Sequence, residues 1–215
     1  MITLYGGASA ASTVVHWLLI ELGLPHELTL FDIDRGEHRT PEYLALNPAG
    51  TVPTLVIDGL VLTETAAIAM HLADLYPARA LAPAVGTSER ALYYQWMFFM
   101  ANTVQPAYRA WFYPTEPAGE ENVEATRRQA RVRVEDAWAR VAAHLEAQAG
   151  ANAGPYLVGA RLTTVDFLTT ILMRWARNMP RPVETWPALA AYARRMKSLP
   201  SFKEVYAREG LTDWT

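Results

Sequence analysis

The sequence has 215 residues, of which 51% are apolar and 19% are charged, as is typical of a globular chain with a sizeable core. Because it contains no cysteine, a disulfide framework, a cysteine-ligated metal site and a cysteine nucleophile are all excluded. The formal net charge of −3 gives no general reason to expect binding to nucleic acid or to an anionic membrane.

The first part of the chain alternates between strand and helix patterns. "ITLY" is typical of a short strand that ends at two glycines, and apolar residues at helical spacing then predict a helix over residues 12–22. "HELTLFDI" alternates like a strand, and residues 40–48 predict a short helix between a capping threonine and a proline. "TVPTLVIDGLVLTE" predicts a hairpin about Asp58-Gly59, followed by a helix over 65–76. The order β-α-β-α-β-β-α describes a small mixed sheet covered by helices.

The rest of the chain predicts helices only, in a separate domain. Residues 79–88, rich in Pro, Ala and Gly, are expected to link a domain over 1–78 to an all-helical domain over 89–215. Charge supports this division, because residues 1–80 carry three Arg and nine acidic residues, whereas the remainder carries sixteen basic and thirteen acidic ones. Apolar periodicity predicts helices over residues 90–110, 122–149, 163–175 and 186–197.

The start of the chain lacks a basic segment followed by an apolar core, so no signal peptide is expected. No apolar run reaches ~18 residues, so no membrane span is expected either. A cytoplasmic location is the resulting expectation.

Two serines, Ser9 and Ser12, stand between the first strand and the first helix. Serine is a common helix cap because its oxygen accepts a free backbone N–H. The same hydroxyls are also placed where one of them can contact a substrate. The residues alone leave both readings open.

"GTVPTL" places a proline where a strand begins, since proline cannot donate to the sheet ladder. The ordinary expectation for Val52–Pro53 is a trans bond, because only about 5% of X-Pro bonds in folded proteins are cis. A cis bond would instead turn the Val52 backbone groups toward a ligand lying along the edge.

Glu64 and Thr65 stand where a strand ends and a helix begins. The first N–H groups of a helix and the Thr65 hydroxyl can hold a carboxylate, while Glu64 can hold an ammonium group beside it. Such a pair matches the zwitterion of an amino acid. The alternative is an ordinary helix cap with an acidic residue beside it.

Other polar and aromatic residues divide between structure and binding. Thr163 and Asp166 form a capping-box pattern ahead of an apolar helix, which assigns Asp166 to folding and not to catalysis. His38 lies in a loop suited to meeting a ligand or solvent, and none of the five histidines has metal-ligand spacing. His16 and His71 lie inside helices as surface or packed residues. Tyr108 and Phe112 are expected to line an apolar pocket near a helix end.

Three segments of the chain together resemble the cytosolic glutathione S-transferases. They are "ITLYGG…WLLIELGLPHEL", "GEHRTPEYLALNPAGTVPTLVIDGLVLTETAAIAMHLADLYP" and "YLVGARLTTVDFLTTILM". The resemblance implies an α/β thioredoxin-like N-terminal domain that binds glutathione, plus an all-α C-terminal helical bundle with the second-substrate pocket. It further implies a cytoplasmic homodimer that acts in detoxification.

The resemblance also assigns roles to the residues singled out above. The family proline is cis, which implies that Val52 precedes a cis Pro53 and pairs its backbone with the cysteinyl part of glutathione. Glu64 and Thr65 would hold the γ-glutamyl amine and carboxylate, although the family more often has Ser at the second position. His38 stands at a position that often reaches the glycyl end. Glutathione is implied as a co-substrate, with no other cofactor and no metal.

Subclass signatures narrow the chemistry to a hydroxyl. Ungapped counting places Ala11 where the bacterial beta class has its cysteine, the zeta signature is absent, and Tyr5 lies within the strand. Ser9 falls on the hydroxyl residue of theta-like and nu-like classes, and Ser12 on the serine of some etherase-like bacterial members. Ser9 is favoured as the partner of the glutathione thiol because Ser12, in the first helical turn, is available for capping.

The function implied is attack of the glutathione thiolate on a hydrophobic electrophile. One alternative is a nu-like disulfide or peroxide reductase, in which two glutathiones replace a protein cysteine. Another is a non-catalytic protein that binds glutathione or another ligand.

Overall fold

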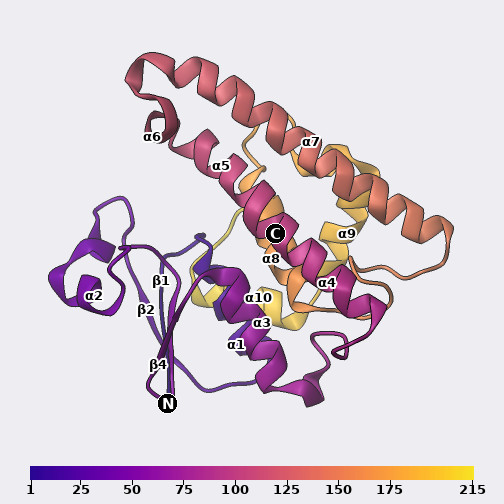
Figure 1. The fold of residues 1–215 in the computed structure, drawn as a ribbon, viewed down its shortest axis with the longest axis horizontal. Helices are drawn as coiled ribbons and strands as arrows, with labels where there is room; N and C mark the ends of the chain where they lie inside the picture. Colours follow the sequence, from indigo (N-terminus) through magenta and orange to yellow (C-terminus); the bar gives the residue numbers. More distant parts are fainter. The chain divides into compact units, whose positions relative to one another are not determined.

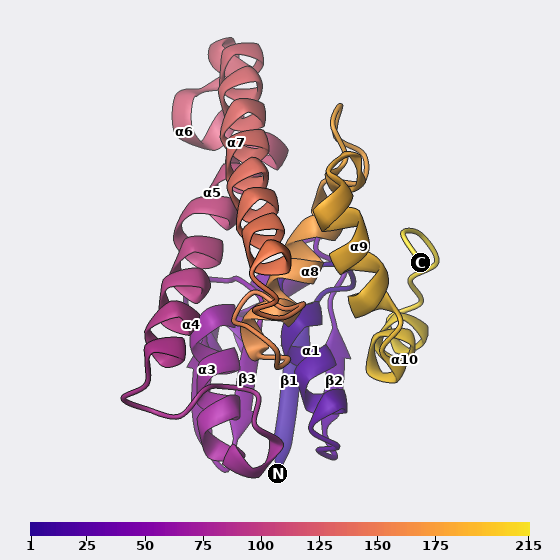
Figure 2. The same ribbon diagram turned by 90° about the vertical axis from the view of Figure 1, so that its right-hand side faces the viewer.

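The computed structural model describes residues 1–215 and divides them into two compact units. One unit combines Met1–Ala82 with Met196–Thr215, and the other comprises Pro83–Arg195. Figures 1 and 2 show the first as a sheet with helices and the second as helices only. None of the helices combines the length and apolar character needed to cross a lipid bilayer.

The sheet has four strands in the order β2-β1-β3-β4. They are β1 (Ile2–Gly6), β2 (Glu27–Leu30), β3 (Thr54–Ile57) and β4 (Leu60–Thr63). β1 runs parallel to β2, while β3 runs antiparallel to both β1 and β4. The β3–β4 turn is Asp58-Gly59, with φ of 50° and 86°, the left-handed conformation that a two-residue hairpin needs. The predicted hairpin is confirmed.

Three helices of this unit follow the predicted order, namely α1 (Ser12–Glu21), α2 (Pro41–Leu46) and α3 (Thr65–Leu75). In Figure 1 the sheet is seen nearly edge-on, with α1 and α3 on one side and α2 on the other. Completely buried side chains of α1 and α3 form the core against the sheet; they include Val14, Val15, Leu18, Leu19, Ile68 and Leu72. α2 begins as predicted, because the Thr40 hydroxyl accepts the Tyr43 N–H.

The last helix of the chain belongs to the sheet unit and was not predicted from the sequence. α10 (Pro200–Arg208) packs on α1, with the rings of Phe202 and Trp17 5.1 Å apart. The indole N–H of Trp17 donates to the Ser201 hydroxyl at 2.8 Å. These contacts explain why residues 196–215 group with the sheet, whereas the sequence-based boundary placed them in the helical domain.

The helical unit contains six α-helices, of which α7 is the longest with 28 residues. They are α4 (Ser88–Phe99), α5 (Gln105–Phe112), α6 (Thr115–Ala118), α7 (Val123–Gly150), α8 (Thr164–Trp175) and α9 (Pro187–Lys197), the last of which runs on into the sheet unit. Both views show α5 lying beside α7.

The helix predicted over residues 90–110 is interrupted. A π-helix, Met100–Val104, separates α4 from α5, and the N–H of Gln105 bonds to the carbonyl of Met100, five residues back. Pro106 explains why an uninterrupted α-helix is unfavourable here, since proline has no N–H to give to the carbonyl four residues earlier. A wider turn is a usual answer to such a break.

α8 is the central helix of its unit, and every residue from Thr164 to Arg174 is buried. The predicted capping box is confirmed. The Asp166 carboxylate accepts the backbone N–H and hydroxyl of Thr163, the N–H of Leu157 and the hydroxyl of Tyr192, at 2.7–2.9 Å. Complete burial raises the pKa of Asp166, an effect that these hydrogen bonds oppose. Its interactions are those of a folding element.

Candidate functional site

All four strands contribute to one end of the sheet, where chain segments leave it together. Tyr5 pairs with Thr54, and Thr54 pairs with Thr63, so the end of β1 lies beside the start of β3 and the end of β4. β2 runs parallel to β1 and ends at the same edge, with Gly6 opposite Leu30. The register therefore brings the predicted segments to one edge; they are the Ser9–Ser12 loop, Val52-Pro53, Glu64-Thr65 and the segment that leads to His38.

The two glycines that end β1 are required by close packing. A side chain at Gly6 would place its Cβ 2.7 Å from the Ser12 Oγ, and one at Gly7 would place it 2.7 Å from the Ile33 Cγ1. Both separations are well inside van der Waals contact. Without side chains here, the loop can close on Ser12 and Ile33.

Ser12 is the residue that closes this loop. Its hydroxyl accepts the N–H of Gly7 at 2.9 Å and donates to the carbonyl oxygen of Gly7 at 3.0 Å. The residue is 1% exposed. A hydroxyl has a single proton, so the proton of Ser12 is committed to Gly7.

Ser9 lies at the tip of the same loop and is partly exposed. Its φ is 66°, a left-handed conformation that few residues with a side chain adopt. Its backbone N–H donates to the Oε2 of Glu209 at 3.2 Å. The loop that carries Ser9 is therefore held in an unfavourable conformation by a partner two hundred positions away.

Glu209, which follows α10 directly, is the centre of a buried polar cluster. Its Oε2 also accepts the hydroxyl of Thr13 at 2.8 Å, and its Oε1 lies 2.8 Å from the Nδ1 of His16. The side chains of both His16 and Glu209 are only 1% exposed. Because a carboxylate is an acceptor, the Nδ1 of His16 is the donor in this pair.

A second histidine completes this region. The ring of His26 meets the ring of His16 edge to face, with centroids 5.3 Å apart. The Nδ1 of His26 bonds to the Leu24 carbonyl at 2.7 Å. Burial lowers the pKa of His26 below its usual value, and the Leu24 hydrogen bond opposes that effect in part.

Residues 51–53, which lead into β3, are positioned by side chains of α2 and of the residue after it. The Val52–Pro53 bond is cis, as the resemblance implied. Just before it, the Thr51 carbonyl accepts the Tyr43 hydroxyl at 2.6 Å and the Asn47 side-chain amide at 2.8 Å. Tyr43 and Asn47, both buried, also reach the Thr54 hydroxyl, so they fix the chain on either side of Val52 and Pro53.

Glu64 and Thr65 form the N-terminal end of α3. Glu64 is exposed and has φ of 68°, and its side chain makes no capping hydrogen bond. Thr65 is 4% exposed and is the first residue of the helix. The helix therefore begins without a side-chain cap, and its first N–H groups point toward the edge where the four segments meet.

His38 lies in a short 3₁₀ turn, Glu37–Arg39, and is buried. Its Nδ1 is buried without a hydrogen-bond partner. Burial lowers the pKa of His38, with a smaller contribution from the charge of Arg39. The imidazole is thus held in its neutral form at neutral pH, with a nitrogen left over for a hydrogen bond.

In the helical unit, Tyr108 and Phe112 stack with ring centroids 6.0 Å apart, and the ring of Trp175 meets both edge-on. Tyr108 is completely buried, and its oxygen accepts the indole N–H of Trp138 at 2.8 Å. Burial raises the pKa of Tyr108 far above its usual value. Phe112 is 45% exposed, so it is the solvent-facing ring of this aromatic cluster, and it packs on the buried ring of Tyr108.

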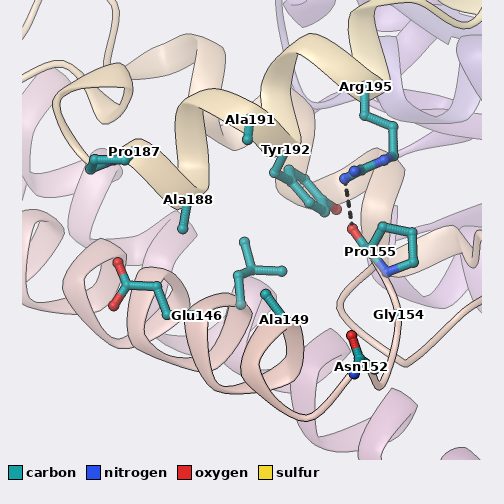
Figure 3. Close-up of a pocket in the computed structure, with 11 residues that line it drawn as sticks. Glu146, Ala149, Asn152, Gly154, Pro155, Pro187, Ala188, Ala191, Tyr192 and Arg195 are labelled. Atoms are coloured by element: carbon teal, nitrogen blue, oxygen red, sulfur yellow. Dashed lines mark hydrogen bonds between the residues drawn. The ribbon is translucent and has the colours of Figure 1, made fainter.

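A separate groove of about 530 Å³ lies between the end of α7 and α9 (Figure 3). Its walls are mainly apolar, with Leu145, Ala149, Ala188 and Ala191, and Arg195 at one end donates to the Pro155 carbonyl at 3.0 Å. None of the predicted site residues lines it.

Sequence reasoning missed Glu209, Thr13 and the role of His16, which was interpreted as a surface or packed residue. The signal available was a lone glutamate before Gly210 at the end of an apolar-periodic segment. No local pattern in that segment predicts that Glu209 bonds to residues on α1.

A four-stranded mixed sheet with α1 and α3 on one face, followed by a helical unit, defines the fold class of the glutathione S-transferases. Family models agree: "Glutathione S-transferase, N-terminal domain" matches residues 8–75, and "Glutathione S-transferase, C-terminal domain" matches residues 102–209. A curated relative, Glutathione S-transferase GST-4.5 of Xanthomonas campestris pv. campestris, is 32% identical over 97% of this chain and 98% of its own length.

Solved structures give the same result. A glutathione transferase from Methylococcus capsulatus is 30% identical, with a TM-score of 0.84 over 99% of this chain and 100% of that one. A sphingomonad glutathione S-transferase, solved in complex with glutathione, is 27% identical, with a TM-score of 0.82 over 98% of this chain and 100% of its own. The chain belongs to the glutathione S-transferase family, a family of transferases, and the predicted fold is confirmed.

Proposed function

We propose that this protein binds glutathione at the edge where the four strand ends meet and transfers its thiolate to a hydrophobic electrophile. The observation that carries the proposal is the convergence of the Ser9 loop, Val52-Pro53 and the uncapped start of α3. Relatives named as glutathione S-transferases and the glutathione complex of a sphingomonad relative support it.

The γ-glutamyl end of glutathione matches the start of α3. Its carboxylate meets the first N–H groups of the helix, the positive end of the helix dipole and the Thr65 hydroxyl. Its ammonium group pairs with Glu64, whose carboxylate is exposed and makes no capping bond. The left-handed φ of Glu64 is the kind of backbone strain that recurs at ligand sites.

The rest of the tripeptide follows the same edge. The backbone of Val52, fixed between Thr51 and Thr54 by Tyr43 and Asn47, pairs with the cysteinyl part. His38, in the 3₁₀ turn after β2, is the proposed hydrogen-bond partner of the glycyl end.

Ser9 is proposed as the hydroxyl that donates to the glutathione sulfur. Ser12 is the weaker candidate because its one proton is donated to Gly7, and moving the hydroxyl would leave the buried N–H of Gly7 without its Ser12 acceptor. Ser9 stands at the partly exposed tip of the loop, directly ahead of α1.

The energy required for thiol activation is modest. A free thiol has a pKa of about 8.5, and lowering it by about two units needs about 2.7 kcal/mol. A hydrogen bond to a charged acceptor contributes about 1.5–3 kcal/mol, and the positive end of a helix adds about 0.3–1 kcal/mol. One hydroxyl at the N-terminal end of α1 is therefore sufficient to lower the thiol pKa by about two units.

In the reaction, glutathione loses its thiol proton to solvent and the sulfur lone pair forms a bond to the electrophilic carbon. The leaving group departs with the electron pair of the broken bond. Phe112, supported by Tyr108 and Trp175, supplies an aromatic surface for the apolar part of the electrophile. A cytoplasmic homodimer is proposed as the working form, to be checked by light scattering after size exclusion.

The test compares wild type with Ser9→Ala, Ser12→Ala and Glu64→Ala for glutathione affinity by calorimetry and for conjugation of an aromatic halide. We expect Glu64→Ala to weaken glutathione binding and Ser9→Ala to slow conjugation with little effect on affinity. Unchanged binding in Glu64→Ala would remove the assigned site. Rapid reduction of a small disulfide by wild type, with little conjugation, would replace the transferase with a glutathione-dependent reductase.

A further inference from the structure

The carboxylate of Glu209 is the group through which the end of the chain reaches the loop that carries Ser9. Three donors on two different segments converge on it, namely the Ser9 N–H, the Thr13 hydroxyl and the His16 Nδ1. All lie in the sheet unit, so their geometry belongs to one compact body. The side chain is 1% exposed, so water does not compete for these bonds.

Other contacts close the base of the loop, and Glu209 bonds to its tip. Ser12 joins its hydroxyl to Gly7, and the Ala10 N–H bonds to the Gly7 carbonyl at 3.1 Å. The φ of 66° at Ser9 is unfavourable for a residue with a Cβ, so a contact is needed to hold it. The bond from the Ser9 N–H to Glu209 orients the same residue whose side chain is proposed to face the sulfur.

We propose that Glu209 is a positioning residue for thiol activation: it fixes the backbone of Ser9, and through it the direction of the hydroxyl, while His16 and Thr13 hold the carboxylate in place. The inference rests on the proposed function, because it concerns the same hydroxyl. Glu209 itself does not touch the substrate.

Two effects of Glu209 on a bound thiol have opposite signs, and this makes the proposal testable. As a negative charge, the carboxylate opposes formation of a nearby thiolate, so its loss alone would move the pH–rate profile to lower pH. As a positioning group, it keeps the Ser9 hydroxyl aimed at the sulfur, so its loss would move the profile to higher pH.

The variants separate these effects. Glu209→Ala removes all three acceptor contacts and is expected to lower kcat at neutral pH by at least about tenfold, in line with the cost of misplacing a reacting group. The KM for glutathione should change less than kcat, and the half-maximal pH should rise. Glu209→Gln loses the charge but keeps an oxygen for the Ser9 and Thr13 donors, so it should retain most of kcat with no rise in the half-maximal pH.

Ser201→Ala is the matched control. It also weakens the packing of α10 on α1, because the Ser201 hydroxyl bonds to Trp17 and Glu21, both on α1 and not on the loop. We expect wild-type kcat and an unchanged pH profile. If Ser201→Ala lost as much kcat as Glu209→Ala, the effect would be one of helix packing and the proposal would fail. It would also fail if folded Glu209→Ala kept wild-type kcat and pH profile.

Two further measurements keep the outcome decisive. If Glu209→Ala does not fold, Thr13→Val removes one donor from the carboxylate and should give a smaller loss of kcat with a shift of the same sign; a wild-type profile would overturn the proposal. Amide hydrogen exchange at Ser9 should be faster in Glu209→Ala than in Glu209→Gln or Ser201→Ala. Hydrogen exchange does not depend on glutathione. If wild type neither bound nor conjugated glutathione, the proposed function would be refuted, and the exchange rates would still show whether Glu209 fixes the backbone of Ser9.

Discussion

The hydroxyl of Ser12 bonds to both backbone groups of Gly7, accepting the N–H at 2.9 Å and donating to the carbonyl at 3.0 Å. One side chain thereby closes a five-residue loop between β1 and α1. The same contact explains why no side chain is tolerated at Gly6, where a Cβ would lie 2.7 Å from the Ser12 Oγ.

Ser12→Ala is predicted to reduce stability. The buried N–H of Gly7 would lose its acceptor, and the Gly7 carbonyl would keep only the Ala10 N–H, which costs about 1–3 kcal/mol of unfolding free energy. Urea denaturation followed by tryptophan fluorescence measures this loss. An unchanged midpoint would show that water or a rearranged loop replaces the hydroxyl.

Gly154→Ala is predicted to be strongly destabilising. Gly154 has φ of 122°, and a Cβ there would lie 2.3 Å from the backbone carbon of Gly159, which cannot move independently. The loss should exceed about 3 kcal/mol. Gly150→Ala is the matched control, since a Cβ at that helical position meets nothing within 4 Å, and it should be neutral or stabilising by up to about 1 kcal/mol. Equal midpoints for the two variants would contradict the prediction.

Asp166→Ala is predicted to destabilise the helical unit by about 3 kcal/mol or more, because the N–H groups of Leu157 and Thr163 and the hydroxyl of Tyr192 would all lose a buried acceptor. Asp166→Asn keeps one oxygen and should lose less. Thermal unfolding of both variants gives the comparison. The interpretation of Asp166 as a structural residue would be wrong if Asp166→Ala stayed as stable as wild type while conjugation alone was lost.

His26→Gln is predicted to reduce the pH dependence of stability. Burial lowers the folded-state pKa of His26 below its ordinary 6.5, so the unfolded chain binds this proton more tightly. The contribution of the neutral ring is complete above pH 6.5 and declines as the pH falls through 6.5 toward the folded pKa. The unfolding free energy of wild type should therefore drop between about pH 7.5 and about pH 5.5 more than that of His26→Gln.

The pKa of His38 is also lowered by burial, so the double variant His26→Gln, His38→Gln should show a still smaller pH dependence of stability. Parallel profiles for all three proteins would contradict this assignment.

Tyr108→Phe is predicted to affect stability, and Phe112→Ala is predicted to affect electrophile binding. Tyr108→Phe leaves the indole N–H of Trp138 without its acceptor and should cost about 1–3 kcal/mol of stability, with little change in conjugation. Phe112→Ala removes a half-exposed ring and should raise the KM for an aromatic electrophile at nearly constant stability. Steady-state kinetics and urea denaturation on the same samples test both. Reversed effects would mean that Tyr108, and not Phe112, meets the electrophile.

Local patterns predicted most of the fold. The Asp58-Gly59 pair located the hairpin because both positions need positive φ, and the Thr163–Asp166 spacing located the start of α8. Pro106 lies inside the helix that was predicted as continuous, and the structure shows a π-helix just before it. A proline within an apolar-periodic segment marks a break, but the hydrogen-bonding pattern that resolves it is not fixed by local sequence.

Long-range partners were the part that sequence reasoning did not reach. The sequence alone does not distinguish Ser9 from Ser12. In the structure, the Ser12 hydroxyl bonds to the Gly7 carbonyl, whereas the Ser9 backbone N–H bonds to Glu209. Tyr108 and Phe112 share a helix face, yet Trp138 of α7 buries the first and leaves the second half-exposed. Such differences follow from the packing of elements distant in sequence.

The sheet unit is assembled from two pieces of chain separated by the whole helical unit. During synthesis, the strands and α1 leave the ribosome long before α10, so the Ser9 loop lacks its hydrogen bond to Glu209 until that residue emerges. A fragment that stops at residue 82 contains every strand but lacks Ser201, Phe202 and Glu209, and with them the surface that covers Trp17. In this fold, the Ser9 loop can therefore take its final conformation only after the whole helical unit has been synthesised.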